Sequence, residues 1–156
     1  MEGRPVAYVD ETGIDTWVQR DYGWSERGVP LVGRVPGRKY ERTGVVAALC
    51  GGEIVAPCQY EDTMDSALFE KWFAQELLPA LPERSVIVMD NAAFHRKAML
   101  RRLAEGTGHS LLFLPPYSPE LNPIEHFWGW LKRYLEKILP LHSTFDEALC
   151  SAFQVR

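Results

Sequence analysis

The 156-residue sequence contains few cysteines, and those it has do not form pairs. Cys50, Cys58 and Cys150 are an odd number and include no CxxC motif. This pattern argues against a disulfide scaffold and against a zinc knuckle. It is typical of reduced thiols inside a cell, so we expect a cytoplasmic protein.

Long apolar runs are also missing. The first 13 residues, MEGRPVAYVDETG, have no basic region followed by an apolar core, so we predict no signal peptide. No apolar run reaches the length of a membrane span. With 46% hydrophobic and 24% charged residues, the composition is that of an ordinary globular chain, and the length suits one domain over residues 1–156.

The sequence lacks a net positive charge. Its formal charge is −4, which counts against a nucleic-acid partner, because DNA-binding proteins are often basic. The distribution of the basic residues weakens this objection. They gather in three clusters, formed by Arg34, Arg38, Lys39 and Arg42, by Arg96, Lys97, Arg101 and Arg102, and by Lys132, Arg133 and Lys137. Each cluster is either a solvated face or a phosphate contact.

Apolar periodicity predicts an α/β fold in which a mixed sheet is covered by helices. Antiparallel strands come first, and strands then alternate with helices. The expected strands lie at residues 6–12, 44–50, 53–60, 85–90 and 110–116, with a tight turn at Gly51–Gly52. The expected helices lie at residues 65–81, 96–106 (closed by Gly106) and 143–154 (capped by Ser143 or Thr144), and another begins at Asn122. Residues 13–43 are expected to be irregular, with one short strand near Trp17–Gln19.

Two of the expected buried strands end in the same way, VAYVD at Asp10 and VIVMD at Asp90. A buried charge is costly unless it is paired or holds a metal. Asp90 and Asn91 could simply end a strand and cap a turn. Two such acids at strand ends also suit a functional site, because open α/β sheets place their sites there.

Glu125 has two explanations. Asn122 is a good N-cap, Pro123 suits the first helical position, and the N3 glutamate could complete a capping box. The helical wheel instead puts Glu125 at the edge of the apolar stripe, with open space expected above it at Gly129. There it could meet Asp10 and Asp90 around a hard cation such as Mg²⁺ or Mn²⁺.

Four motifs in order resemble the catalytic domain of bacterial insertion-sequence transposases related to the mariner superfamily. They are VDETG, GWSERGVP, VMDNAAFH and LPPYSPELNPIEHFWGWLKR, and the resemblance runs from about Tyr8 to Tyr134. Such DDE enzymes have a ribonuclease H-like, retroviral-integrase-like fold. This implies a mixed five-stranded sheet, with three antiparallel strands followed by two parallel ones. The family's last two acids are separated by 34 residues, as Asp90 and Glu125 are here (125 − 90 − 1).

The resemblance implies that Asp10, Asp90 and Glu125 are the catalytic triad. Two Mg²⁺ ions, about 3.5–4 Å apart, would lie between them, and Mn²⁺ would substitute. One site would then perform DNA strand cleavage and strand transfer on transposon ends and target, with the protein as a homo-oligomer on double-stranded DNA.

The resemblance also gives roles to further residues. Asn91 and His95 match positions that orient the site or touch DNA, and Trp24, Gly28 and Pro30 match an element of less certain role. Arg96, Lys132 and Arg133 are candidates for phosphate contacts, whereas Glu11 should point to the other side of its strand and be structural. Relatives carry an N-terminal helix-turn-helix module that binds the transposon ends, and we expect this module to be absent here.

Three alternatives stay open. A resolvase-like nuclease of the same fold would cut DNA without joining it. A non-catalytic remnant, or a subunit from a separate reading frame, would bind only DNA or a partner transposase. Zinc ligation by His95 and His126 is a third alternative, but these residues are far apart in sequence and have no thiolates at metal-ligand spacing.

Overall fold

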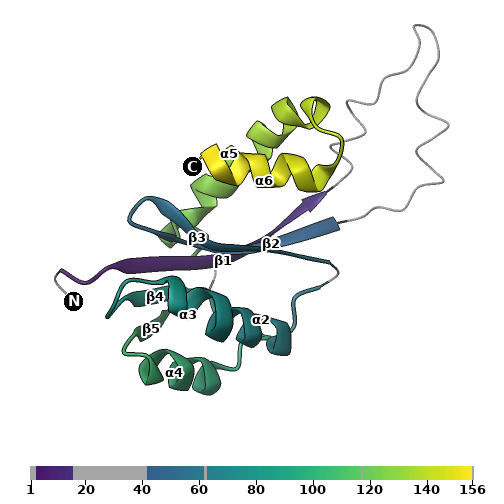
Figure 1. Cartoon of the computed structure of the whole chain (residues 1–156). Helices are drawn as coiled ribbons and strands as arrows, with labels where there is room; N and C mark the ends of the chain where they lie inside the picture. Colours follow the sequence, from purple (N-terminus) through teal and green to yellow (C-terminus); the bar gives the residue numbers. More distant parts are fainter. Residues whose placement is uncertain (1–2, 16–41, 62, 117, 156) are drawn as a thin grey trace, which may run out of the picture.

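The protein folds around a mixed five-stranded sheet with helices on both faces (Figure 1). The computed structural model describes residues 3–15, 42–61, 63–116 and 118–155. The strand order is β3-β2-β1-β4-β5, in which β1, β2 and β3 pair antiparallel and β4 and β5 extend the sheet in parallel. The strands are β1 (Val6–Asp15), β2 (Arg42–Cys50), β3 (Glu53–Glu61), β4 (Val86–Met89) and β5 (Ser110–Phe113). This confirms the expected ribonuclease H-like arrangement.

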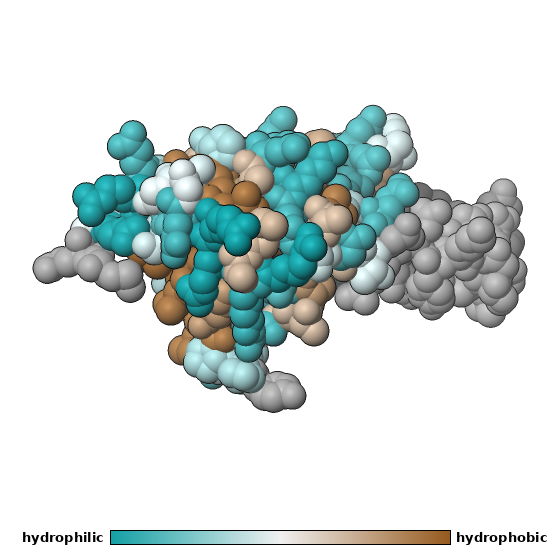
Figure 2. Space-filling model, turned by 90° about the horizontal axis from the view of Figure 1, so that it is seen from below, coloured by the Kyte–Doolittle hydropathy of each residue, from teal (hydrophilic) through white to brown (hydrophobic). Residues whose placement is uncertain are grey.

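The helices form two layers. Those on one face are α2 (Ser66–Trp72), η2 (Phe73–Leu77), α3 (Leu78–Ala80) and α4 (Lys97–Gly106), and those on the other are α5 (Ile124–Ile138) and α6 (Phe145–Val155) (Figure 1). Short 3₁₀ turns, η3 (Pro119–Leu121) and η4 (Leu139–Leu141), precede and follow α5. On the side that carries α4, hydrophilic residues alternate with smaller hydrophobic areas (Figure 2). No helix in the described part of the chain is long and apolar enough to span a membrane.

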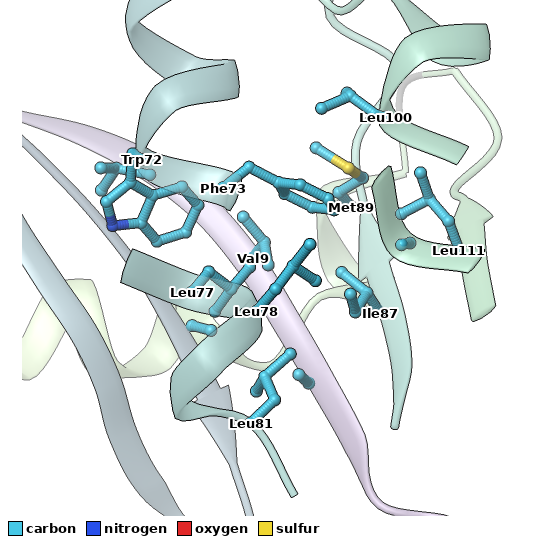
Figure 3. Close-up of a cluster of buried hydrophobic side chains, with 14 of the residues drawn as sticks. Val9, Trp72, Phe73, Leu77, Leu78, Leu81, Ile87, Met89, Leu100 and Leu111 are labelled. Carbon is cyan, nitrogen blue, oxygen red and sulfur yellow. The ribbon is translucent and has the colours of Figure 1, made fainter. Parts of the chain in front are cut away.

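Each face of β1 packs against a different helix layer. Ala7 and Val9 are buried in the cluster that also contains Phe73, Leu77 and Met89 (Figure 3). Ile14 belongs to the cluster formed with α5 and α6. Because side chains alternate along a strand, this assigns Glu11 to the α2 side and Asp10 to the α5 side.

The parallel pairing of β1 with β4 aligns Asp10, inside β1, with Asp90, which follows β4. Tyr8 pairs with Val88, an offset of 80 residues. Continuing this register by two residues places Asp10 beside Asp90, just beyond the end of β4 at Met89.

The hairpin prediction is confirmed, and the structure adds a bulge to it. Gly51 and Gly52 have φ angles of 61° and 81°, which a residue with a side chain would adopt only with strain. The pairing of β2 with β3 shifts between Val46 and Ala48, and Ala56 has a φ of 53°. At this bulge the Ala56 carbonyl accepts a hydrogen bond from Trp72 Nε1 at 2.8 Å.

Several expected boundaries were wrong. Strand β1 continues through Gly13 to Asp15, because it pairs with β2 over its whole length. The helix expected at 65–81 begins as predicted, with Asp65 Oδ1 accepting from Leu68 N at 2.7 Å, but it contains the π-helical turn η2. Gly106 lies inside α4, and the residue with positive φ after it is Gly108. The short strand expected near Trp17–Gln19 lies outside the described residues.

Candidate active site

A cavity of about 400 Å³ opens beyond the ends of β4 and β5, beside the middle of β1 and the start of α5. All three acids expected to form the triad, Asp10, Asp90 and Glu125, contribute to its wall. The other lining residues come from the turns after β4 and β5 and before α5; they are Asn91, Ala92, Leu114, Pro115, Pro116, Ser118, Pro119 and Asn122. The cavity thus lies at the carboxyl ends of β4 and β5, where open α/β sheets place their sites, whereas Asp10 lies inside β1 and not at its end as the sequence suggested.

Asp10 is the most buried acid of this cavity, with 9% of its surface exposed. Trp128 Nε1 donates to Asp10 Oδ2 at 3.3 Å. Burial, a side-chain hydrogen bond with Glu125 and the nearby charges of Glu11 and Glu125 raise the pKa of Asp10 from 3.8 to about 9. Without a cation beside it, Asp10 therefore keeps its proton at neutral pH.

Glu125 does not form the capping box that its position in the sequence suggested. The N–H of Asn122, which a capping-box glutamate would accept, donates instead to Pro119 O at 3.0 Å. Asn122 does cap the helix, since its Oδ1 accepts from Ile124 N at 3.3 Å, but α5 begins at Ile124 rather than at Pro123. Glu125 is exposed, and its side chain forms a hydrogen bond with that of Asp10.

Asp90 is held in the ionised form. His95 Nε2 lies 3.2 Å from Asp90 Oδ1, and Ala92 N donates to the same oxygen at 3.4 Å. The hydrogen bond from His95 lowers the pKa of Asp90 and outweighs the opposing effect of burial. Because an ionised carboxylate only accepts, Nε2 of His95 carries the hydrogen.

His95 is well placed to orient Asp90. The residue is 7% exposed, and its ring packs against those of Phe69 and Phe94 with centroids 4.4 and 4.3 Å away. A buried imidazole between two aromatic rings has little freedom to turn. His95 was expected either to orient the site or to contact DNA, and its buried position favours the first role.

Glu11 lies on the opposite face of β1, as expected, yet it is close to the site. One of its carboxylate oxygens, one oxygen of Asp90 and one ring nitrogen of His95 lie within 4.8 Å of one another. Burial, followed by the charge of Asp90, raises the pKa of Glu11 to about 8. Glu11 Oε1 is buried without a hydrogen-bond partner. Glu11 therefore affects the electrostatics of the site. Its role is not only structural, as the sequence had suggested.

The remaining expected residues lie at different distances from the cavity. Asn91 is exposed and lines it. Arg96 donates two hydrogen bonds of 2.6 Å to Glu70, so its guanidinium group is already paired with a carboxylate. Lys132 is exposed and lines a separate cavity between α5 and the end of β1.

Arg133 corrects the expectation about Gly129. A Cβ atom at Gly129 would lie 3.5 Å from Arg133 Nη1. The space expected to be open above Glu125 is therefore bordered by a guanidinium group. Trp24, Gly28 and Pro30 lie outside the described residues.

Trp128 was not among the site residues expected from the sequence. It is 2% exposed, and a buried indole N–H usually has a hydrogen-bond acceptor. Trp128 follows Glu125 by three residues, which places the two side chains next to each other on a helix. A tryptophan expected to be buried, one turn from a candidate metal ligand, could therefore have indicated a hydrogen bond to the site.

The donor set of the cavity fits a divalent hard cation. Asp10, Asp90 and Glu125 supply carboxylate oxygens, which Mg²⁺ and Mn²⁺ prefer. The strongly raised pKa of Asp10 shows how unfavourable a further negative charge is in this place. A cation would remove that penalty and release the proton.

The metal-free protein should lose stability as pH rises. Asp10 and Glu11, with pKa values of about 9 and about 8 in the folded chain, bind protons more tightly when folded than when unfolded. Their contribution is complete below about pH 4 and is lost as pH rises to about 9. We expect Tm in EDTA to fall from pH 6 to pH 9, and Asp10→Asn to raise it at pH 9 by at least about 3 °C.

Thermal unfolding of wild type, Asp10→Asn and the exposed control Glu105→Gln would test this. Mg²⁺ should restore the wild-type Tm at pH 9, because it binds the ionised form. A wild-type Tm that stays level or rises over this range would contradict the stated protonation of the site.

Comparison with known proteins shows the family of the chain. The sequence profile of the DDE superfamily endonuclease family matches residues 5–147. The chain belongs to this family. The matched range includes Asp10, Asp90, Glu125 and all the described strands.

The fold of this DDE superfamily endonuclease domain resembles those of transposase and integrase catalytic cores. The Mos1 transposase catalytic domain with raltegravir and Mg matches with a TM-score of 0.64 and 16% identity, over 97% of this chain and 71% of that one. The catalytic core domain of BIV integrase matches with a TM-score of 0.57 and 15% identity, over 95% and 80%.

Longer relatives are matched only in part. In the Mos1 transposase paired-end complex with the left transposon end, the match covers 96% of this chain and 51% of that one, with a TM-score of 0.60 and 19% identity. An uncharacterized protein y4pE/y4sA of Sinorhizobium fredii (strain NBRC 101917 / NGR234) is 38% identical over 48 residues, which are 31% of this chain and 33% of that protein. The chain thus spans about half of the Mos1 transposase chain and matches a third of the S. fredii protein.

Proposed function

We propose that this domain cleaves DNA strands and transfers them during transposition of an insertion sequence, in a reaction that depends on a divalent metal. The observation that carries the proposal is the single cavity lined by Asp10, Asp90 and Glu125. Family membership and the likeness of the fold to transposase and integrase cores support it. The substrates would be double-stranded DNA carrying the transposon ends and the target DNA, bound by a homo-oligomer.

Asp10, Asp90 and Glu125 would hold the metal, Mg²⁺ or Mn²⁺. When bound, such a metal makes a water or a DNA 3′-hydroxyl more acidic and stabilises charge on the departing oxygen. Solved Mos1 paired-end complexes with Mg and with Mn are consistent with this choice of metal.

The protein's own groups would prepare the site in different ways. His95 keeps Asp90 ionised and turned in one direction. Trp128 holds one oxygen of Asp10. Glu125 is exposed on α5 and meets Asp10 at the cavity, so its carboxylate can approach a bound phosphodiester together with the metal.

Phosphate binding would come from basic side chains near the cavity. Arg133 lies beside Gly129, one turn beyond Glu125, and Lys132 is exposed on the same helix. Arg96 would contact DNA only by exchanging its ion pair with Glu70 for a phosphate.

Cleavage of DNA that carries the element's own ends would test the function. We expect nicking and strand transfer by wild type with Mg²⁺ or Mn²⁺, and neither with EDTA nor with Asp90→Ala. Cutting without joining would identify a resolvase-like nuclease instead. Metal-independent DNA binding with no cutting, together with capture of a full-length transposase, would identify a non-catalytic subunit.

A further inference from the structure

Two buried side chains of the α5 region form hydrogen bonds to β1 on either side of Glu125. Asn122 Nδ2 donates to Val9 O at 3.2 Å, and Trp128 Nε1 donates to Asp10 Oδ2 at 3.3 Å. Asn122 is 4% exposed and Trp128 2% exposed, so neither bond competes with bulk water. The two acceptors are consecutive residues of β1, and one of them is a proposed metal ligand.

The indole group suits the task of fixing a carboxylate. It has one donor and no acceptor, and it does not titrate, so it can do nothing at Asp10 except donate. The ring is held in place by Phe127, with centroids 5.4 Å apart, and by the rest of the α5–α6 core. With Oδ2 engaged by Trp128, the orientation of the Asp10 carboxyl is set relative to the cavity that Asp10 lines.

The spacing of the two donors also sets the position of Glu125. Asn122, Glu125 and Trp128 follow one another at intervals of three residues, and α5 begins at Ile124 between them. Asn122 also caps α5 through its Oδ1, so the same side chain starts the helix and joins it to β1. Sliding or rotating α5 over β1 would break both bonds and move Glu125 away from Asp10.

We propose that Trp128 and Asn122 are positioning residues, which dock α5 on β1 so that Asp10 and Glu125 present their carboxylates to one metal. This inference rests on the proposed function and adds two residues that act through the positions of Asp10 and Glu125. Groups that orient metal ligands typically change metal affinity or activity by about 10–100-fold when they are removed.

The chain contains a matched control. Trp72 is also 2% exposed and also donates one hydrogen bond through its indole, to Ala56 O at 2.8 Å. Trp72 packs in the other core cluster, on the far side of the sheet from α5. Trp72→Phe therefore removes the same atoms and the same type of bond as Trp128→Phe, but its acceptor is a backbone carbonyl of β3 instead of a proposed metal ligand.

The experiment compares wild type, Trp128→Phe and Trp72→Phe as full chains. Mn²⁺ dissociation constants by calorimetry, Tm in EDTA, and the Mg²⁺ concentration that gives half-maximal cleavage would be measured for each. We expect similar falls in Tm for the two variants. Only Trp128→Phe should weaken Mn²⁺ binding and raise the Mg²⁺ requirement, both by about 10-fold or more.

Asn122→Ser gives a second test that does not depend on removing a large core side chain. Serine is also a good N-cap, so α5 should still begin correctly, but the donor to Val9 O is lost. We expect weaker Mn²⁺ binding with a Tm near that of wild type. Equal Mn²⁺ affinity in Trp128→Phe and Trp72→Phe, or an unchanged Asn122→Ser, would overturn the positioning role.

The outcomes separate this inference from the proposed function. If wild type binds Mn²⁺ but does not cut DNA, the proposed function fails and the binding constants alone decide the positioning role. If wild type neither binds Mn²⁺ nor cuts DNA, both fail.

Discussion

Replacing Asp90 by Asn is expected to reduce DNA cleavage by at least about 10³-fold, because a metal contributes several kcal/mol to the transition state and each 1.4 kcal/mol is a factor of ten. Asp90 is the acid that is already ionised in the folded protein, since His95 lowers its pKa. An amide at this position would be a much poorer ligand for Mg²⁺. Single-turnover cleavage with saturating DNA would measure the loss.

The fold of Asp90→Asn should remain intact, but in EDTA it should be somewhat less stable than wild type, because the lowered pKa means that ionised Asp90 stabilises the folded chain at neutral pH. The loss should be small, since removing this charge also removes one of the causes of the raised pKa of Glu11. Asp65→Asn is the matched control, because Asp65 is an exposed helix cap and Asn also serves as a cap. Normal turnover by Asp90→Asn would show that Asp90 only ends a strand.

Replacing Glu125 by Gln should abolish cleavage to a similar extent while leaving stability within about 1 kcal/mol of wild type. Glutamine could also serve at the N3 position of a capping box, so that explanation would make the change silent. The structure has no such box, because the Asn122 N–H is bonded to Pro119 O. The carboxylate of Glu125 is therefore available to a metal.

Glu136→Gln on the same helix provides the control, since Glu136 is exposed and lines a different cavity. Cleavage rates and chemical denaturation of both variants would be compared with wild type. If Glu125→Gln cut and joined DNA at the normal rate, the glutamate would have no catalytic role and the chemistry would lie elsewhere.

The fold was predictable from the sequence because its strands and helices have clear periodicity. The apolar runs before Asp10 and Asp90 both form strands of the sheet, and the Gly51–Gly52 turn has the positive φ angles that its residues suggest. What the sequence did not predict depends on pairing between distant residues. Strand β1 extends to Asp15 only because β2 pairs with it there, and the bulge at Ala56 is bonded to Trp72, 16 residues away.

The acids of the site could be recognised from the ends of apolar runs and from a motif, but their environments could not. His95 approaches Asp90 because the turn after β4 packs the His95 ring against Phe69 and Phe94. Glu11 was expected to be structural, since strand alternation turns it away from Asp10. Its nearness to Asp90 arises beyond the end of β4, where alternation no longer fixes the direction of side chains.

The hydrogen bond of Trp128 could not be predicted from the sequence either. Its helical position predicted burial correctly, but periodicity contains no information about where an indole N–H points. Only the docking of α5 on β1 brings that group to Asp10, 118 residues away in sequence. The hydrogen-bond partner of Asp10 was therefore hidden among residues typical of an ordinary core.

The most direct test of the central claim, that Asp10, Asp90 and Glu125 share one divalent metal, is a crystal structure of the protein grown with Mn²⁺ and measured at the manganese absorption edge. We expect an anomalous peak in the cavity between Asp10 of β1 and the end of β4, with oxygen atoms of all three carboxylates at about 2.0–2.3 Å, the range for hard divalent cations. A peak held by other residues, or an empty cavity at saturating Mn²⁺, would contradict it.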